Sequence, residues 1–302
     1  MEFLIYSPDV RHALDRNTPV VALESTIITH GMPFPQNLET ARQVEAAVRD
    51  AGATPATIAV LDGRLHVGLT DAQLSQLAQA QDVAKLSRAD LAVCMARGQT
   101  GSTTVAATMI AAHLAGIDVF ATGGIGGVHR GAEESYDISA DLQELAQTPV
   151  TVVCAGAKAI LDLPKTLEVL ETLGVPVIAV GQDMLPAFWS ASSSLPAPLR
   201  MDDPAGIAAA HRLRAQLGLP GGQLIANPIP TASEIPADRL APLIAQATEE
   251  AEAQKITGKA VTPYLLRRLF ELTDGQTLEA NIALVLNNAR LAAAIAAELV
   301  DT

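Results

Sequence analysis

The sequence predicts an α/β fold, a layered α/β/α arrangement with a largely parallel central sheet. Short apolar runs typical of buried strands alternate with stretches of helical period along most of the chain, and this alternation favours βαβ units. Neither a linker-like change of composition nor an internal repeat interrupts the pattern. We therefore expect a single domain over residues 1–302.

Turn and capping residues mark the elements of the first half. Asp62-Gly63 predicts a hairpin turn, Thr70 and Gln73 have the form of a capping box, and Ser102 or Thr103 can cap a helix that runs to about Ala115. An earlier helix is expected over about 38–51, after a Gly- and Pro-rich loop. The strands expected here are 19–23, 57–61, 64–68, 90–95 and 119–122.

The second half begins with an apolar run, 149–158, which is expected to be a buried strand ending at Lys158. A short helix from about Ala140 precedes it, and further strands are expected at 176–180 and 223–226. Helices are expected to fill much of the remainder.

Charge and composition exclude several classes of function. The net charge of −13 leaves no basic stripe for nucleic acid, although a small phosphorylated substrate needs only a few local donors. Cys94 and Cys154 lie in apolar, strand-like runs without metal-ligand spacing, so we expect reduced core residues. The N-terminus lacks signal-peptide form, and polar residues interrupt the Ala-rich C-terminal segment. We therefore expect a cytoplasmic protein without a membrane span.

Lysine is rare in this chain, and Lys158 follows the 149–157 apolar run. A neutral amine can attack a carbonyl, which an arginine cannot do, and an apolar setting disfavours the charged form. The alternative is a lysine that extends from a strand end into solvent. Glu24 likewise directly follows an apolar strand, where a half-buried carboxyl can donate protons or simply cap a loop.

Two glycine-rich loops can approach an anion or another ligand. The segment 98–105 leads hydroxyl groups into a helix N-terminus, which suits phosphate, but it lacks the P-loop lysine. The segment 121–131 carries four glycines in five positions, with His129 and Arg130, and does not match the dinucleotide fingerprint. Ordinary capping and turn formation also explain both segments. Lys85 is a candidate phosphate or sugar contact, or a solvated lysine.

Asp137 and Asp141 are four residues apart and would share a face if both lay on a helix. Because histidines are few and cysteines unpaired, oxygen ligands favour a hard divalent ion such as Mg²⁺ or Mn²⁺. Ser139 or Asp141 can instead cap the helix that follows.

Seven segments in order along nearly the whole chain resemble the pseudouridine-5′-phosphate glycosidases, also called the indigoidine synthase A family. They are VALESTIITHGMPFPQNLETA, KLSRADL, TGSTTVAATM, FATGGIGGVHRGAEESYDISADLQELAQTPVTVVCAGAKAILDLPKTLE, IANPIP, VTPYLL and NIALVLNNARLAA. The resemblance implies reversible cleavage of the C–C glycosidic bond of pseudouridine 5′-phosphate to uracil and ribose 5-phosphate. It also implies a homotrimer.

Residue roles come from the same resemblance. Lys158 matches the Schiff-base lysine, Glu24 the proton donor and Asp137 the ligand of a metal, usually manganese. The substrate contacts implied are Lys85, Val105 through its backbone, Ser139, Ala140, Asp141, Thr122, His129 and Asn281. Such chemistry fits the residue types, because a C–C bond has no leaving-group oxygen for a conventional pair of carboxyl groups to protonate.

Two other functions stay open at this point. One is a Schiff-base aldolase or lyase on another phosphosugar, which would use Lys158 but would need no nucleobase pocket. The other is a non-catalytic, nucleotide-binding accessory protein, whose function would survive loss of Lys158.

Overall fold

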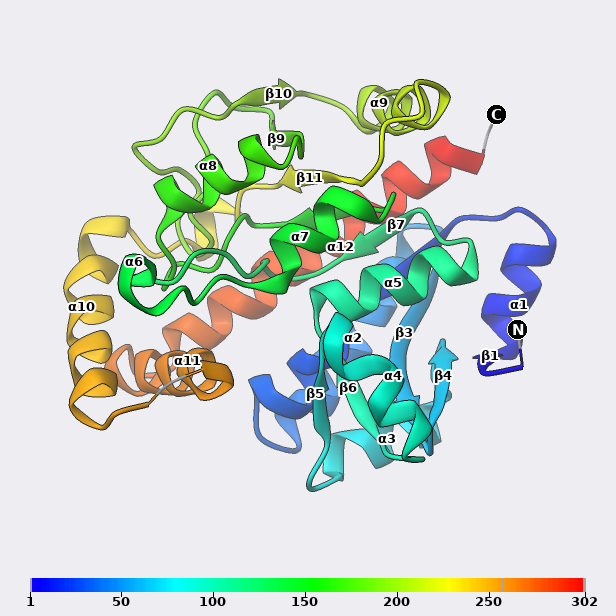
Figure 1. Ribbon diagram of the computed structural model, residues 1–302. Helices are drawn as coiled ribbons and strands as arrows, with labels where there is room; N and C mark the ends of the chain where they lie inside the picture. The colour runs from blue at the N-terminus through cyan, green and yellow to red at the C-terminus, as the bar shows by residue number, and fades with distance from the viewer. Residues whose placement is uncertain (1, 257, 301–302) are drawn as a thin grey trace.

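The computed structural model describes residues 2–256 and 258–300 and contains one mostly parallel sheet (Figure 1). The strand order is β1-β4-β3-β2-β7-β8-β11-β9-β10, with β6 pairing with β3 and β5. The strands are β1 (Leu4–Tyr6), β2 (Val20–Leu23), β3 (Thr54–Leu61), β4 (Arg64–Val67), β5 (Ala84–Leu86), β6 (Gly101–Thr103), β7 (Val119–Ala121), β8 (Thr151–Cys154), β9 (Val177–Val180), β10 (Leu199–Met201) and β11 (Gln223–Ala226). Only the β3–β4 and β3–β6 pairs of the described strands are antiparallel.

Helices cover both faces of the sheet, as Figure 1 shows. They are α1 (Pro8–Asp15), α2 (Gln36–Asp50), α3 (Asp71–Gln79), α4 (Arg88–Ala96), α5 (Val105–Ala115), α6 (Ala132–Ser135), α7 (Ala140–Gln147), α8 (Leu163–Thr172), α9 (Pro204–Gln216), α10 (Ala237–Ala253), α11 (Val261–Leu272) and α12 (Gln276–Val300). Short segments are a π-helix, η1 (Ile27–Gly31), and two 3₁₀ turns, η2 (Thr231–Ser233) and η3 (Gly258–Ala260). Helix α5 packs with α7 on one face, and α12 packs with α2 and α9 on the other. The predicted α/β class is confirmed.

The central strands are buried on both faces, which explains why their sequences are continuous apolar runs. All four residues of β2, and all four of β8, are buried. The Asp62-Gly63 hairpin is confirmed, with both residues at positive φ between β3 and β4. The Thr70 capping box is confirmed as well.

The prediction of a strand over 90–95 is wrong, because this segment is helix α4. Its apolar residues are buried with helical spacing, Leu91 and Cys94, while Val93 is 50% exposed. The backbone N–H of Ser87 donates to Asp90 Oδ2 over 3.0 Å, as in a capping box. Cys94 is therefore a helical core residue, whereas Cys154 lies in a strand as expected.

Two other predicted boundaries shift. Ser102 and Thr103 belong to β6, and Thr104 caps α5 by accepting from Ala107 N–H. The run 149–158 forms a strand only over Thr151–Cys154, so Lys158 lies four residues beyond the strand, in the loop that follows it.

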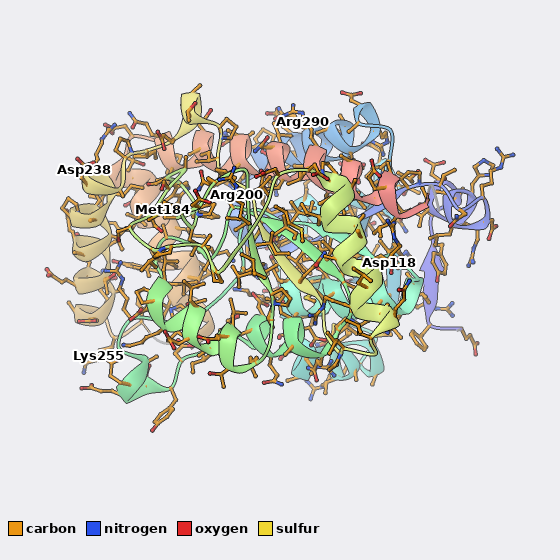
Figure 2. The ribbon with its side chains drawn as sticks, turned by 90° about the horizontal axis from the view of Figure 1, so that it is seen from above. Asp118, Met184, Arg200, Asp238, Lys255 and Arg290 are labelled. Atoms are coloured by element: carbon orange, nitrogen blue, oxygen red, sulfur yellow. The ribbon has the colours of Figure 1, made fainter. Side chains whose placement is uncertain are left out.

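Helix α12 is long and apolar enough to cross a membrane by length and composition alone. It contacts β2, β7 and β8 of the sheet as well as α2 and α9, and its Leu284, Ala289 and Ile295 are buried there. This is the environment of a core helix, which passes the same test. Figure 2 shows Asp238, in the first turn of α10, and Lys255, two residues beyond its end, along one outer side of the molecule.

Candidate active site

Two cavities share a wall at the carboxyl ends of the central strands, where α/β proteins usually bind ligands. The shared wall consists of Glu24, Thr26, Lys85, Lys158 and Thr262. One cavity, of about 410 Å³, is bounded by η1, α11 and α12 and is called the α11 cavity here. The other, of about 280 Å³, is bounded by the N-termini of α5 and α7 and is called the α5 cavity. The sequence-predicted lysine and carboxyl group therefore face the same space.

The loops that follow β7 and β8 are hydrogen-bonded to each other and position Lys158. Its backbone N–H donates to Ile125 O over 3.1 Å, and Ile125 also pairs with Ala157. A Cβ at Gly124 would lie 2.6 Å from the Phe188 ring and 3.0 Å from Gly156 O, so a side chain there would push the loops apart. The Lys158 side chain consequently extends from a rigid support into the shared wall.

Glu24 is the first residue after β2, and hydroxyl groups hold both of its oxygens. Thr26 donates to Oε2 and Thr122 donates to Oε1. Thr122 is 1% exposed and lines neither of the two large cavities. The structure therefore places Thr122 behind Glu24, where it orients the carboxyl group.

The α5 cavity presents backbone donors at two helix N-termini. In the described chain, the first N–H groups of α5 and α7, those of Val105 and Ala140, donate to no protein group. The next N–H groups are occupied: Asp141 Oδ1 accepts from Ala106 over 3.0 Å, and Ser139 Oγ accepts from Asp141 over 3.2 Å. Free N–H groups at helix N-termini, with Lys85 beside them, suit a phosphate group.

Asp141 is buried and links three segments of this cavity. Its Oδ2 accepts from Gly126 N–H over 2.8 Å, while Oδ1 holds α5. A Cβ at Gly126 would lie 2.2 Å from Ser139 Oγ, so the glycine is required by the close approach. Both Asp141 oxygens thus fix the cavity wall.

His129 lines the α5 cavity, and Asp137 lies next to it. Burial is the main cause that lowers the pKa of His129; the Lys158 and Lys85 charges act in the same direction, and Asp137 opposes them. The ring is therefore neutral at pH 7. Asp137 O accepts from His129 N–H over 3.0 Å. Asp137 precedes α7, so the idea that it shares a helical face with Asp141 is wrong, because Tyr136 adopts a positive φ and α7 begins at Ala140.

No cluster of three or more His, Cys, Asp or Glu residues within 2–256 and 258–300 has the geometry of a metal site. A metal at Asp137 would have to complete its coordination with water or substrate oxygens. Mg²⁺ commonly binds in that way, with one or two carboxylates.

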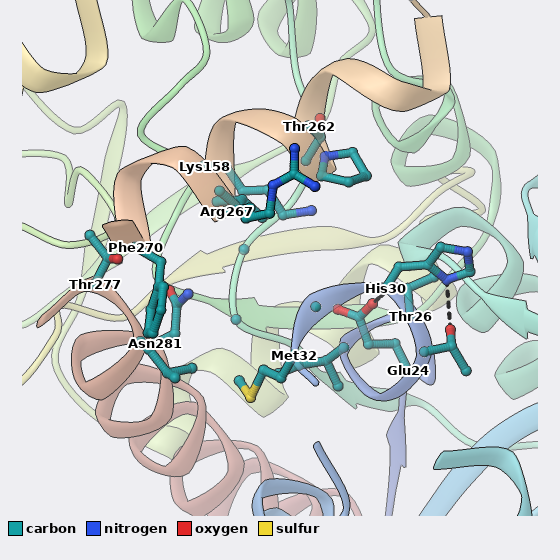
Figure 3. A pocket seen from close by; sticks show the side chains of 18 of the residues that line it. Glu24, Thr26, His30, Met32, Lys158, Thr262, Arg267, Phe270, Thr277 and Asn281 are labelled. Atoms are coloured by element: carbon teal, nitrogen blue, oxygen red, sulfur yellow. Dashed lines mark hydrogen bonds between the residues drawn. The ribbon is translucent and has the colours of Figure 1, made fainter. Parts of the chain in front are cut away.

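The α11 cavity has a more apolar wall, shown in Figure 3. Asn281 projects into it from α12; its Oδ1 accepts from Trp189 Nε1 over 2.7 Å, which leaves the amide N–H groups for a ligand. Other polar and aromatic side chains of this wall had not been predicted from the sequence. They are Thr29, His30, Phe188, Thr262, Arg267, Phe270 and Thr277. The VTPYLL segment, which contains Thr262, resembles the family and could have pointed to this wall, but no role had been assigned to any of its residues.

A half-buried lysine and a carboxyl group that line the same cavities, at the strand ends of an α/β fold, form the kind of site found in enzymes. The family model described as "Indigoidine synthase A like protein" matches residues 9–298, and the chain belongs to this family. The suspected resemblance is confirmed.

Relatives in several bacteria carry the name pseudouridine-5′-phosphate glycosidase. The protein from Jannaschia sp. (strain CCS1) is 72% identical over 98% of both chains, and that from Solibacter usitatus (strain Ellin6076) is 62% identical over 97% of this chain and 98% of its own. These names confirm the prediction of an enzyme.

Solved structures have the same fold. The prealnumycin C-glycosynthase AlnA, in complex with ribulose 5-phosphate, superposes with a TM-score of 0.92 at 40% identity, covering 100% of this chain and 98% of its own. An indigoidine synthase A-like protein from Thermotoga maritima gives 0.89 at 31% identity, covering 99% and 97%.

Proposed function

We propose that this protein catalyses the reversible cleavage of pseudouridine 5′-phosphate to uracil and ribose 5-phosphate. The observation that carries the proposal is the position of Lys158 and Glu24 on the wall between two unlike cavities. One cavity offers helix N-termini for a phosphate, and the other has room and apolar walls for a flat ring. The names of the relatives and the phosphosugar in the AlnA complex support this assignment.

In the cleavage direction, Nζ of Lys158 attacks C1′ of the sugar and displaces the ring oxygen O4′, which takes a proton from Glu24. The nitrogen, now positively charged, returns a proton to the Glu24 carboxylate, which passes it to the uracil carbon C5. The nitrogen lone pair then forms a C1′=N double bond as the C1′–C5 bond breaks, and the electrons of that bond remain on uracil. Water hydrolyses the iminium to ribose 5-phosphate and releases Lys158. The Thr26 and Thr122 hydroxyls keep the Glu24 carboxyl directed at the shared wall.

The α5 cavity would bind the 5′-phosphate. The N–H groups of Val105 and Ala140 are the donors, and Lys85 supplies charge near them. Asn281, on the opposite side of the shared wall, would contact the base with its amide N–H groups. His129, neutral at pH 7, would contact the sugar from the α5 cavity.

Manganese or another divalent ion at Asp137, a homotrimeric assembly and a cytoplasmic location belong to the same proposal. A divalent ion would supply charge that orients and polarises substrate oxygens near Asp137. The backbone contact between Asp137 and His129 supports a site at the edge of the α5 cavity.

Borohydride reduction in the presence of ribose 5-phosphate tests the proposed function. We expect one reduced pentose-phosphate adduct on Lys158, located by intact mass and peptide mapping. Lys165→Ala is the control variant, because Lys165 is an exposed lysine paired with Glu133 and should leave the adduct unchanged. Absence of an adduct on folded wild-type protein would exclude the covalent mechanism, and an adduct without uracil release from pseudouridine 5′-phosphate would favour another phosphosugar lyase.

A further inference from the structure

His30 occupies a position in the α11 cavity that the proposed mechanism does not use. It lies in η1, a π-helix of five residues directly after the Glu24 loop. Short π-helical segments are rare and occur frequently at functional sites. The ring is partly buried, and Figure 3 shows it on the same side of the cavity as Glu24.

All the hydrogen bonds of the ring to the described residues involve Nδ1. Thr29 Oγ1 lies 2.6 Å from Nδ1 and Ser102 Oγ lies 3.3 Å from it. Thr29 Oγ1 in turn donates to Ser102 Oγ over 2.8 Å, and Ser102 Oγ donates to Ala84 O over 3.5 Å. The Nε2 atom is thus left for a ligand.

The direction of this chain fixes the tautomer. A hydroxyl group has one proton, and Thr29 Oγ1 directs it away from His30, to Ser102 Oγ over 2.8 Å or to Ser25 O over 3.5 Å. The short contact between Thr29 and His30 therefore needs its proton from Nδ1. With Nδ1 protonated and the ring neutral, Nε2 carries a lone pair and is an acceptor.

The surroundings keep the ring neutral. Burial is the main cause that lowers the pKa of His30, and the positive charge of Lys85 lowers it further. Lys85 is the register partner of Ser102 in the β5–β6 pair, so this charge sits beside the hydroxyl chain. No carboxylate contributes to the shift.

A C-linked pyrimidine needs such an acceptor. Because its sugar is attached to C5, the ring keeps both N–H groups, and a buried N–H without a partner is costly. The acceptor oxygens of Asn281 and Glu24 each already accept one hydrogen bond, from Trp189 and from Thr26 and Thr122, whereas Nε2 of His30 accepts none from the described residues.

We propose that Nε2 of His30 accepts a hydrogen bond from one ring N–H of the pyrimidine, which makes His30 a residue that positions the base and selects for it. This inference rests on the proposed function and deepens it. It separates binding of the base, on the His30 side, from capture of the sugar by Lys158.

Two isosteric variants test the proposal in the synthesis direction, with uracil, 1-methyluracil and 3-methyluracil as probes. His30→Gln places an amide oxygen near the Nε2 position, whereas His30→Asn places its amide near Nδ1, so it keeps the Thr29 contact and loses the acceptor. We expect wild type and His30→Gln to disfavour one methyluracil by about 10-fold or more. In His30→Asn the KM for uracil should rise by about 10-fold, as expected for one lost hydrogen bond, and the discrimination should disappear.

Borohydride trapping of ribose 5-phosphate on Lys158 should be equal in all three proteins. Unchanged discrimination in His30→Asn, or a loss of kcat at constant KM for uracil, would overturn the role proposed for His30. Failure of wild-type protein to trap ribose 5-phosphate or to couple it with uracil would instead contradict the proposed function itself.

Discussion

The α5 and α11 cavities meet at the same lysine but are constructed by different means. The α5 cavity is made mainly of backbone N–H groups and close loop contacts, with Asp141 and Gly126 fixing the wall. The α11 cavity is made mainly of side chains on η1, α11 and α12. Substitutions should therefore affect binding in the two cavities separately. Backbone geometry governs binding in the α5 cavity, and side-chain identity governs binding in the α11 cavity.

The largest effect is expected for Lys158→Ala, which removes the group that both cavities share. Turnover should fall on the order of 10⁴-fold or more, since Lys85, the other lysine of the shared wall, is assigned to the phosphate and not to the sugar carbon. The thermal midpoint should stay close to wild type, because Lys158 is a half-buried loop residue and its backbone bond to Ile125 O is kept in the variant. Steady-state assays and a thermal melt measure the two quantities. Retained turnover in this variant would remove the lysine mechanism.

Glu24→Gln should have the next largest effect, about 10²–10⁴-fold on kcat, the usual worth of a general acid. The amide keeps the shape and the place between Thr26 and Thr122 but carries no transferable proton. Ribose 5-phosphate should still be trapped on Lys158 by borohydride. Loss of trapping in this variant would show that Glu24 acts before the adduct forms.

Gly126→Ala should damage the α5 cavity selectively. The new Cβ would lie 2.2 Å from Ser139 Oγ and 2.8 Å from Asp141 Oδ2, so the phosphate donors must move. The KM for ribose 5-phosphate should rise by about 10–100-fold while the KM for uracil stays constant, because a misplaced charged contact weakens binding of the anion. Gly206→Ala on α9, with its nearest neighbour at 3.4 Å, is the matched control. Equal effects on both KM values would argue against separate half-sites.

Asp137→Asn should abolish stimulation by Mn²⁺, an effect of about 10-fold, since the remaining neighbour His129 alone is a poor site. Activity is measured after chelation and titration with MnCl₂. Stimulation that persists unchanged would place the metal away from Asp137.

Phe270→Ala should have the smallest effect. It tests the α11 cavity alone, because Phe270 does not line the α5 cavity. Loss of one aromatic contact should raise the KM for uracil by about 5-fold and leave the KM for ribose 5-phosphate unchanged. Phe3→Ala is the control, because Phe3 is 41% exposed, nearly the same as the 42% of Phe270, and lines neither cavity. A matching rise in Phe3→Ala would mean that the effect is not local.

The sequence predicted the half of the site that is built on the sheet. Strands β2 and β8 are buried on both faces, so their apolar runs locate Glu24 and bring Lys158 to the same edge. The same reasoning failed over 90–95, because a short apolar run does not distinguish a strand from a helix with buried residues at Leu91 and Cys94.

The α11 cavity was far less predictable. His30 and Phe270 are 240 positions apart in the chain, and each looks like an ordinary loop or surface helix residue until tertiary packing brings η1 and α11 together. Thr122 was expected to contact the substrate, but its hydroxyl donates to Glu24. The direction in which a side chain points at the end of a strand decides between these two roles, and the sequence does not show that direction. Asn281 was located by resemblance, while its bond to Trp189 required the structure.

Helix α12 holds together parts of the site that come from distant segments of the chain. Asn288, fully buried, donates to Thr122 O over 2.8 Å and accepts from Asn227 Nδ2 over 3.0 Å, so the last helix ties together the ends of β7 and β11. The backbone of Thr122, whose side chain holds Glu24, is therefore fixed in place only when α12 is docked. Removing α12 should therefore yield a protein without activity and with an exposed sheet face that aggregates.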